Sequence, residues 1–242
     1  MSDGIRFGEV AEVYDEVRPG YSPELAGAIA RYHGSAPADV VEVGAGTGKG
    51  TEVLRALGGR LTCIEPDERM AALLRARFPD VAVLVRRFED GGAGPADVLG
   101  CALAWHWLNP GRRNRLAFDA LRPGGTLAIF GHRYAYADPG HERAFDEAFA
   151  SVDPRPAQPR AEPHDDVLAS GLWADVRAER SSRHLALDAD AYLRLVRTFG
   201  PFRAKSAPEQ ERTLGVLAAT LQRLGGGTVL DLRATLTLAR RA

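Results

Sequence analysis

The sequence predicts an α/β fold in which a mostly parallel sheet is flanked by helices. Short apolar runs alternate with helical segments along the first half of the 242-residue chain, which is the pattern of successive β-α units. One such run, residues 40–43, is followed by glycines at positions 44, 46 and 48. Glycine is needed where a backbone turns sharply and approaches a ligand, because a Cβ would obstruct both. We therefore expect a buried strand, a ligand-binding turn and a helix start here.

The composition favours one globular domain without a strong surface charge. With 45% hydrophobic residues, a chain of this length buries one sizeable core. The formal net charge of -1 and the pI near 6.6 give no field that would attract nucleic acid or an anionic membrane. We therefore expect a small or neutral partner, with no nucleic acid and no membrane.

The two cysteines indicate a reducing compartment. Cys63 and Cys101 lie inside apolar runs and lack the paired spacing of a zinc site or a disulfide framework. We expect them in the core, and we expect no metal site. Residues 1–7 lack the charged start and apolar stretch of a secretory signal, and no apolar run approaches membrane-spanning length. These features favour a cytoplasmic protein.

Apolar and helical periodicities predict the order of the elements within a single domain spanning residues 1–242. Strands are expected at residues 40–43, 61–64, 81–85, 97–104, 127–130, 173–183 and 228–239. Helices are expected at residues 51–57, 67–78, 111–121, 140–152, 189–199 and 208–224. Residues 131–136 are expected to leave the end of the fifth strand, and residues 153–163 to form a proline-broken loop.

The spacing of the glycines separates three kinds of nucleotide-binding turn. The dinucleotide motif Gly-x-Gly-x-x-Gly fails because its third glycine position is Lys49. The phosphate loop Gly-x-x-x-x-Gly-Lys-Ser/Thr fails because its first position is Val43 and its last is Gly50. The turn therefore fits neither motif.

The pattern Glu42-x-Gly44-x-Gly46-x-Gly48 resembles the first motif of class I methyltransferases that use S-adenosylmethionine (SAM). The resemblance implies a Rossmann-like class I methyltransferase sheet, mostly parallel with an antiparallel last strand and an inserted helical cap. It also implies SAM as the cofactor and S-adenosylhomocysteine as its product. The methionine moiety would be held by Glu42, Gly44, Ala45, Gly46 and Gly48.

The acidic residue Glu65 follows the second strand, about twenty residues past the glycine turn. Doubly wound sheets place a carboxylate there against ribose hydroxyls, which SAM and NAD both carry. The run Glu65-Pro66-Asp67-x-x-Met70 resembles the second methyltransferase motif, whose apolar residue lies on the adenine. Met70 also falls on the apolar face of its helix, so core packing is the alternative for it.

The segment that includes Tyr14, Arg18, Pro19 and Tyr21 resembles the Tyr-Asp-x-x-Arg-Pro-x-Tyr lead-in of one branch of small bacterial class I methyltransferases. The resemblance implies that Tyr14 and Arg18 contact the methionine end of SAM, with Arg18 paired to its carboxylate. The alternative is a helix and a proline turn with two surface aromatic residues.

Residues 86–90 follow the third strand, where the family holds adenine through a side chain and a backbone amide. Here Arg87 and Phe88 stand where the family has a polar and a small residue. Phe88 and Glu89 are the expected contacts, although Asp90 or the backbone alone are alternatives to Glu89.

The run Trp105-His106-Trp107 follows the fourth strand, where open α/β sheets bring side chains to the ligand crevice. The family branch carries a similar His-Trp turn, and we expect residues 104–107, including Ala104, to flank the transferable methyl group. His106 is either a general base or a structural donor that shapes the methionine pocket.

The second half of the chain is expected to select the substrate. The last two strands resemble the antiparallel pair that closes a methyltransferase sheet. The resemblance divides the domain into cap helices (1–35), a SAM-binding core (36–131), substrate-side insertions (132–227) and a closing strand (228–242). Five side chains are expected to face a substrate, with solvated arginines and core aromatic residues as the alternative: Trp107, His132, Tyr134, Tyr192 and Arg197.

These patterns together predict a SAM-dependent methyltransferase that acts on an O, N or C nucleophile of a small molecule. Two alternatives are an oxidoreductase that uses NAD and a SAM-binding protein without catalytic activity.

Overall fold

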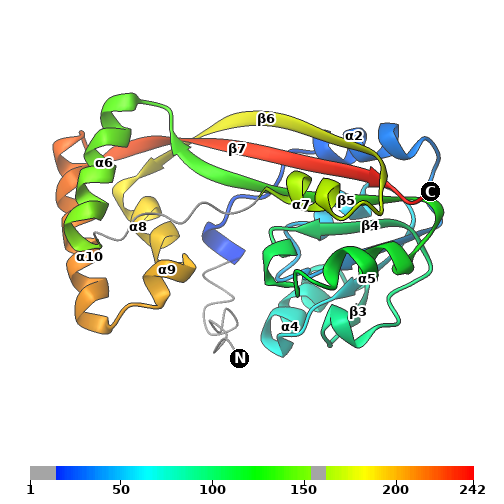
Figure 1. Cartoon of the computed structure of the whole chain (residues 1–242). Helices are drawn as coiled ribbons and strands as arrows, with labels where there is room; N and C mark the ends of the chain where they lie inside the picture. The colour runs from blue at the N-terminus through cyan, green and yellow to red at the C-terminus, as the bar shows by residue number, and fades with distance from the viewer. Residues whose placement is uncertain (1–14, 154–161) are drawn as a thin grey trace. The chain divides into compact units, whose positions relative to one another are not determined.

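A computed structural model of the chain describes residues 15–153 and 162–242 (Figure 1). Its strands form a 7-stranded sheet of order β3-β2-β1-β4-β5-β7-β6. The strands are β1 (Asp39–Val43), β2 (Arg60–Ile64), β3 (Ala82–Leu84), β4 (Ala96–Ala102), β5 (Leu121–Tyr136), β6 (Ala174–Asp188) and β7 (Gly227–Arg240).

The α-helices of the described residues lie between these strands and before β1. They are α2 (Glu24–His33), α3 (Thr51–Arg55), α4 (Glu68–Arg77), α5 (Arg113–Ala120), α6 (Pro139–Val152), α7 (Pro163–Ala169), α8 (Ala189–Arg197), α9 (Gly200–Arg203) and α10 (Ala207–Arg223). Two short 3-10 helices, η2 (Phe88–Asp90) and η3 (Trp105–Trp107), follow the ends of β3 and β4.

The sheet is mostly parallel and has an antiparallel strand near one end. The pairs β1-β2, β1-β4, β2-β3 and β4-β5 are parallel. Strand β7 runs antiparallel to β5, because Gly124 bonds to Arg241 at one end and Ala137 bonds to Val229 at the other. The predicted α/β class with a mostly parallel, Rossmann-like sheet and an antiparallel closing strand is therefore confirmed.

The chain divides into two compact units. Among the described residues, unit 1 comprises residues 15–18, 132–153 and 181–234, and unit 2 comprises residues 19–131, 162–180 and 235–242. Three of the boundaries between them fall inside β5, β6 and β7.

The core of unit 2 is explained by the alternation of side chains along its central strands. Val40 and Val98 belong to one buried cluster, whereas the next residues, Val41 and Leu99, belong to another. Successive side chains of a strand point to opposite faces, so a strand with apolar residues at every position is buried on both. This explains why the parallel strands appear in the sequence as continuous apolar runs.

Two parts of the structure differ from the predicted elements. Strand β5 continues to Tyr136, whereas residues 131–136 were expected to leave the sheet after Phe130. Helix α7 begins at Pro163, where the expected loop ended, and its first turn carries two acidic residues. Proline at the first position and acidic residues in the first turn both stabilise a helix start. The sequence therefore carried a signal for a helix beginning at Pro163.

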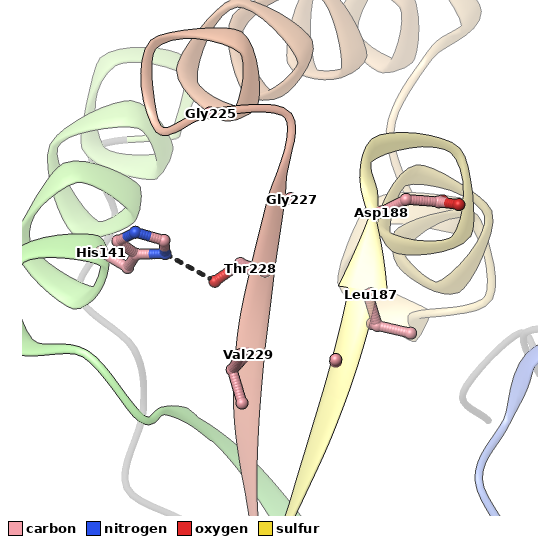
Figure 2. A pocket seen from close by; sticks show the side chains of 8 residues that line it. His141, Leu187, Asp188, Gly225, Gly227, Thr228 and Val229 are labelled. Atoms are coloured by element: carbon pink, nitrogen blue, oxygen red, sulfur yellow. Dashed lines mark hydrogen bonds between the residues drawn. The ribbon is translucent and has the colours of Figure 1, made fainter.

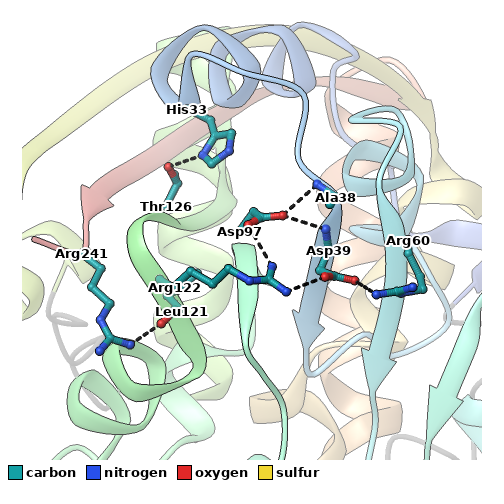
Figure 3. A network of polar contacts seen from close by, with 9 residues as sticks. All are labelled: His33, Ala38, Asp39, Arg60, Asp97, Leu121, Arg122, Thr126 and Arg241. Carbon is teal, nitrogen blue, oxygen red and sulfur yellow. Dashed lines mark hydrogen bonds and ion pairs between the residues drawn. The ribbon is translucent and has the colours of Figure 1, made fainter.

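A polar network joins the starts of three strands in unit 2 (Figure 3). The Asp97 carboxylate accepts bonds from the amides of Ala38 and Asp39 at 2.8 and 2.9 Å and pairs with Arg122 at 2.9 Å. Arg122 also pairs with the Asp39 carboxylate at 2.7 Å. The network therefore holds the starts of β1, β4 and β5 in register.

Replacing Asp97 with alanine is expected to lower the free energy of unfolding by about 2 to 3 kcal/mol, because two backbone amides and Arg122 lose a charged acceptor. Urea unfolding followed by circular dichroism measures this loss. The matched control is Asp80→Ala, which removes a pair with Arg55 whose side chains are both more than half exposed, so we expect a much smaller loss of stability. Equal losses in the two variants would contradict this role of the network.

Candidate cofactor-binding site

The glycine turn between β1 and α3 has a backbone that only glycine adopts readily. Gly44, Gly46 and Gly48 have φ values of +67°, +56° and +98°, in the left-handed region where a Cβ is strained. The amides of Gly44 and Ala45 both donate to the carbonyl of Ile64, at 2.9 and 3.2 Å. The turn is therefore fixed to the end of β2.

The three glycines face different surroundings. A Cβ on Gly44 would lie 2.4 Å from the Cβ of Ala104, and one on Gly48 would lie 2.5 Å from the ring of Phe78. A Cβ on Gly46 would meet Met70 only at 3.9 Å. Gly44 and Gly48 are thus required by neighbouring protein atoms, whereas Gly46 leaves space for another group to approach the backbone.

Glu65 connects the glycine turn to the start of α4. Its carboxylate accepts bonds from the amide of Gly46 at 2.8 Å and from the amide of Asp67 at 2.9 Å. Burial raises the pKa of Glu65, and these two backbone bonds oppose that shift. Asp67 in turn caps α4 by accepting from the amides of Arg69 and Met70. The acid that was predicted to bind ribose therefore lies beside Gly46.

Glu42 is completely buried inside β1. One carboxylate oxygen, Oε2, accepts bonds from Thr51 and Cys63. The other, Oε1, has no hydrogen-bond partner among the described residues, and a Cβ on Gly50 would lie 2.4 Å from it. Burial, the largest cause, raises the pKa of Glu42 to about 7. The predicted contact between Glu42 and the methionine ammonium stays a prediction.

The residues predicted around adenine lie at the ends of β2 and β3. Phe88 is buried in the same cluster as Ile64, and Met70 is 6% exposed. The Glu89 carboxylate accepts from the amide of Asn109 at 3.2 Å, and Asp90 accepts from the amide of Arg87 at 3.1 Å. Both acidic side chains thus bind backbone amides of unit 2. Of the other predicted residues here, Pro66 is exposed.

The turn after β4 begins with a strained residue. Leu103 has a φ of +53°, which is unfavourable for a residue with a Cβ and is held only by its surroundings. Its amide donates to the carbonyl of Phe130 at 2.9 Å. Trp105 is buried, whereas His106 is exposed and its ring lies 4.8 Å from the ring of Trp107, itself 52% exposed. The turn therefore presents His106 and Trp107 at the surface of unit 2.

Arg18 belongs to a polar and aromatic cluster within unit 1. It donates to the hydroxyl and the carbonyl of Thr198 at 2.9 and 3.1 Å and to the hydroxyl of Tyr134 at 3.5 Å. The guanidinium lies 4.6 Å from the ring centre of Phe199, which is a cation-π distance. His132 bonds to the same Tyr134 hydroxyl at 3.2 Å. Arg18, predicted to contact the methionine end of SAM, thus meets His132 and Tyr134, which were both predicted to face a substrate.

His132 is neutral in this cluster at physiological pH. Burial, followed by the charges of Arg18 and Arg183, lowers the pKa of His132 to about 4. A neutral imidazole can accept a proton, so the cluster joins a potential base to a phenol and a fixed cation. Of the other residues predicted for the substrate, Tyr192 is buried and bonds to Tyr136, and Arg197 is exposed.

One predicted residue, Tyr14, lies outside the described residues. Unit 1 also contains a cavity of about 400 Å³ that none of the predicted site residues lines (Figure 2). Its lining includes His141, which bonds to Thr228 at 2.9 Å, together with Leu187 and Asp188. Among the described residues, no cluster of His, Cys, Asp and Glu could hold a metal ion.

Three polar residues near the Trp105 turn were not predicted. Asp166 on α7 accepts bonds from the indole of Trp105 and from the side chains of Arg113 and Asn114. The helix-start signal at Pro163 was available, but the spacing of residues 105, 113 and 166 along the chain gave no sign that they meet.

Comparisons with known proteins relate the chain to methyltransferases. Residues 41–129 match the family model described as Methyltransferase domain. Uncharacterized methyltransferases of Mycobacterium tuberculosis and Mycobacterium bovis are each 34% identical to the chain over 127 residues, which cover 52% of this chain and 51% of each relative. The matched part of the chain therefore spans about half the length of these curated relatives.

Solved structures extend the likeness to nearly the whole chain. A protein of Anaeromyxobacter dehalogenans, assigned as a type II methyltransferase, has a TM-score of 0.68 at 23% identity and covers 93% of this chain and 96% of its own. Phosphoethanolamine N-methyltransferase 2 of Haemonchus contortus, in complex with SAM, has a TM-score of 0.56 at 14% identity over 99% of this chain and 60% of its own. The chain thus shares the Rossmann-like α/β fold of these structures, and residues 41–129 match the methyltransferase domain model.

No helix of the described residues is both long enough and apolar enough to span a membrane.

Replacing Gly44 with alanine is expected to lower the free energy of unfolding by more than about 3 kcal/mol, because left-handed strain adds to the overlap with Ala104. The matched control is Gly58→Ala, which also has a positive φ but has no atom within 4 Å of the added Cβ, and costs about 1 to 2 kcal/mol. Urea unfolding of both variants measures the difference. Failure of Ala104→Gly to recover stability in the Gly44→Ala background would contradict the close approach.

The free energy of unfolding is expected to contain a contribution from Glu42 that falls as pH rises from about 4.5 to about 7. The folded protein keeps the Glu42 proton over this range while the unfolded chain releases it, so raising the pH favours unfolding. The shift corresponds to roughly 3 kcal/mol. Unfolding of the wild type and of Glu42→Gln across this range measures the contribution as the difference between their pH profiles. Parallel profiles would show that the Glu42 pKa is not raised.

Proposed function

We propose that this protein is a SAM-dependent methyltransferase that transfers a methyl group to an O, N or C nucleophile of a small molecule. The observation that carries the proposal is the glycine turn, in which the space beside Gly46 adjoins the Glu65 carboxylate. The methyltransferase domain match over residues 41–129 covers both residues. Structural neighbours with bound SAM or S-adenosylhomocysteine support the same cofactor.

The residues of unit 2 fit the chemistry of this cofactor. Glu65 uses its two oxygens for two backbone amides, and a carboxylate has about four acceptor positions, so ribose hydroxyls can add to it. Phe88 and Met70 supply apolar surface for adenine. The turn does not match the phosphate-loop motif, which agrees with a cofactor that carries no phosphate.

SAM supplies a methyl group that its sulfonium has already activated. The protein must therefore hold the acceptor in line with the breaking bond and exclude water, and orientation of this kind contributes about 7 to 11 kcal/mol in favourable cases. In this proposal residues 104–107 lie beside the methyl group, and His106 either takes a proton from the acceptor or shapes the pocket. Trp107 within unit 2, and separately His132, Tyr134, Tyr192 and Arg197 within unit 1, stay predictions for contact with the acceptor.

Calorimetric titration with SAM and S-adenosylhomocysteine tests the proposal, with NADH as the alternative ligand. We expect micromolar or tighter binding of both sulfur compounds and no binding of NADH. Glu65→Ala is expected to weaken SAM binding by about 1 to 3 kcal/mol, because a charged acceptor for two hydroxyls is lost.

The control is Glu68→Ala, which removes an exposed carboxylate from the first turn of α4, shortly after Glu65 in the chain. SAM affinity should not change in this variant. Unchanged affinity in folded Glu65→Ala would remove Glu65 from the ribose site. Binding of NADH without SAM would overturn the methyltransferase proposal, and binding of SAM without methyl transfer to any screened acceptor would favour a non-catalytic SAM-binding protein.

A further inference from the structure

Asp166, to which the proposed function assigns no role, lies at the centre of a mostly buried polar cluster that includes Trp105. Its Oδ2 atom accepts bonds from Trp105 Nε1 at 2.8 Å, Arg113 Nε at 3.0 Å and Asn114 Nδ2 at 2.9 Å. Its Oδ1 atom pairs with Arg113 Nη2 at 2.6 Å. One carboxylate of α7 thus connects η3 to the first turn of α5.

The cluster is a mostly buried ion pair with its polar atoms satisfied. The Asp166 and Arg113 side chains are 18% and 11% exposed. Burial opposes ionisation of the acid, but bonds from Arg113, Trp105 and Asn114 outweigh it and lower the pKa of Asp166. The carboxylate is therefore charged at neutral pH, and hydrogen bonds to a charged acceptor are stronger than neutral ones.

Trp105 is held by this pair at two points. Its indole donates to Asp166, and its carbonyl accepts from Arg113 Nη1 at 3.1 Å. The Arg113 guanidinium also lies 5.5 Å from the centre of the Trp105 ring. Both the side chain and the backbone of Trp105 are therefore fixed by residues outside its own turn.

The position of Trp105 bears directly on the glycine turn. The preceding residue, Ala104, leaves no room for a side chain on Gly44. Leu103, one residue earlier, has the unfavourable φ of +53°, and such a backbone persists only where its surroundings determine it. A shift of Trp105 would therefore displace Ala104, its neighbour in the chain, from its close contact with Gly44.

The chain after α7 is also bonded to α5, the helix that carries Arg113 and Asn114. Trp173 donates to the Oδ1 atom of Asn114 at 3.0 Å, and its ring packs edge-on against Phe118 at 5.4 Å. Residues 163–173 are thus attached to α5 at both ends, through Asp166 and through Trp173. This attachment keeps the Asp166 carboxylate at a fixed distance from Trp105.

We propose that Asp166 is a positioning residue that holds Trp105 and Ala104 against the glycine turn, and that cofactor affinity depends on it. The inference rests on the proposed function, in which that turn binds SAM. Asp166 itself need not contact the cofactor, because its effect is transmitted through Trp105.

The test compares Asp166→Asn, which keeps the size of the side chain but removes its charge, with Asp165→Asn. Asp165 is the exposed neighbour on the same helix, with a side chain that is 76% exposed. Binding of S-adenosylhomocysteine is measured by calorimetry, and the indole N–H signals by NMR. Trp105→Phe identifies the Trp105 signal, because it removes the indole donor and retains an aromatic ring.

In Asp166→Asn we expect affinity for S-adenosylhomocysteine to fall at least about fivefold and the Trp105 indole signal to shift. Asp165→Asn should change neither. The double variant Asp166→Asn/Trp105→Phe should bind no more weakly than the weaker-binding single variant. Both changes act on the same hydrogen bond, between the Trp105 indole and Asp166. A role in stability alone would lower the melting temperature and leave the affinity of the folded variant unchanged.

Two outcomes separate the inference from the proposed function. If the wild type binds S-adenosylhomocysteine and folded Asp166→Asn binds it within twofold of the wild type, the positioning role is overturned and the proposed function stands. If the wild type binds neither S-adenosylhomocysteine nor SAM, the proposed function fails and the inference fails with it. If Asp166→Asn does not fold, unchanged affinity in Trp105→Phe overturns the positioning role.

Discussion

The attachment of the glycine turn to the end of β2 is the interaction on which the candidate site depends. The Ile64 carbonyl accepts hydrogen bonds from two backbone amides of the turn, and the Glu65 carboxylate accepts one from a third. These bonds bring the ends of β1 and β2 together, and the close contact between Gly44 and Ala104 adds the end of β4. The site is thus a property of adjacent parallel strands, whose carboxyl ends meet at one edge of a sheet.

The features that the sequence predicted are those encoded within a few residues of one another. The apolar run before Gly44, the alternating glycines and the acid after the second strand each have a local physical cause, and the structure contains all three. The fold class followed because alternating strands and helices permit few arrangements of a sheet. Roles in ligand binding, such as that of Glu42, depend on a cofactor that the sequence implies only through resemblance.

The features that the sequence did not predict depend on contacts between distant segments. Asp166 bonds to Trp105 across 61 positions of the chain, and no local pattern shows which tryptophan an acid will meet. Arg18 likewise bonds to Thr198 across 180 positions. Strand β5 extends beside β7 as far as Tyr136, and the next residue, Ala137, donates its amide to the carbonyl of Val229 on β7. The local sequence therefore predicts the end of a strand poorly where the hydrogen bonds of that end come from a strand far away in the chain.

The division of the chain into two units has a consequence for how the protein could arise and be altered. Each unit is assembled from three separated stretches of the chain, and the chain crosses between the units within β5, β6 and β7. Neither unit corresponds to a contiguous gene fragment, so a single recombination event could not exchange one of them intact. Change in either unit would therefore arise by substitution, or by insertion between the shared strands, where helices α6 to α10 lie.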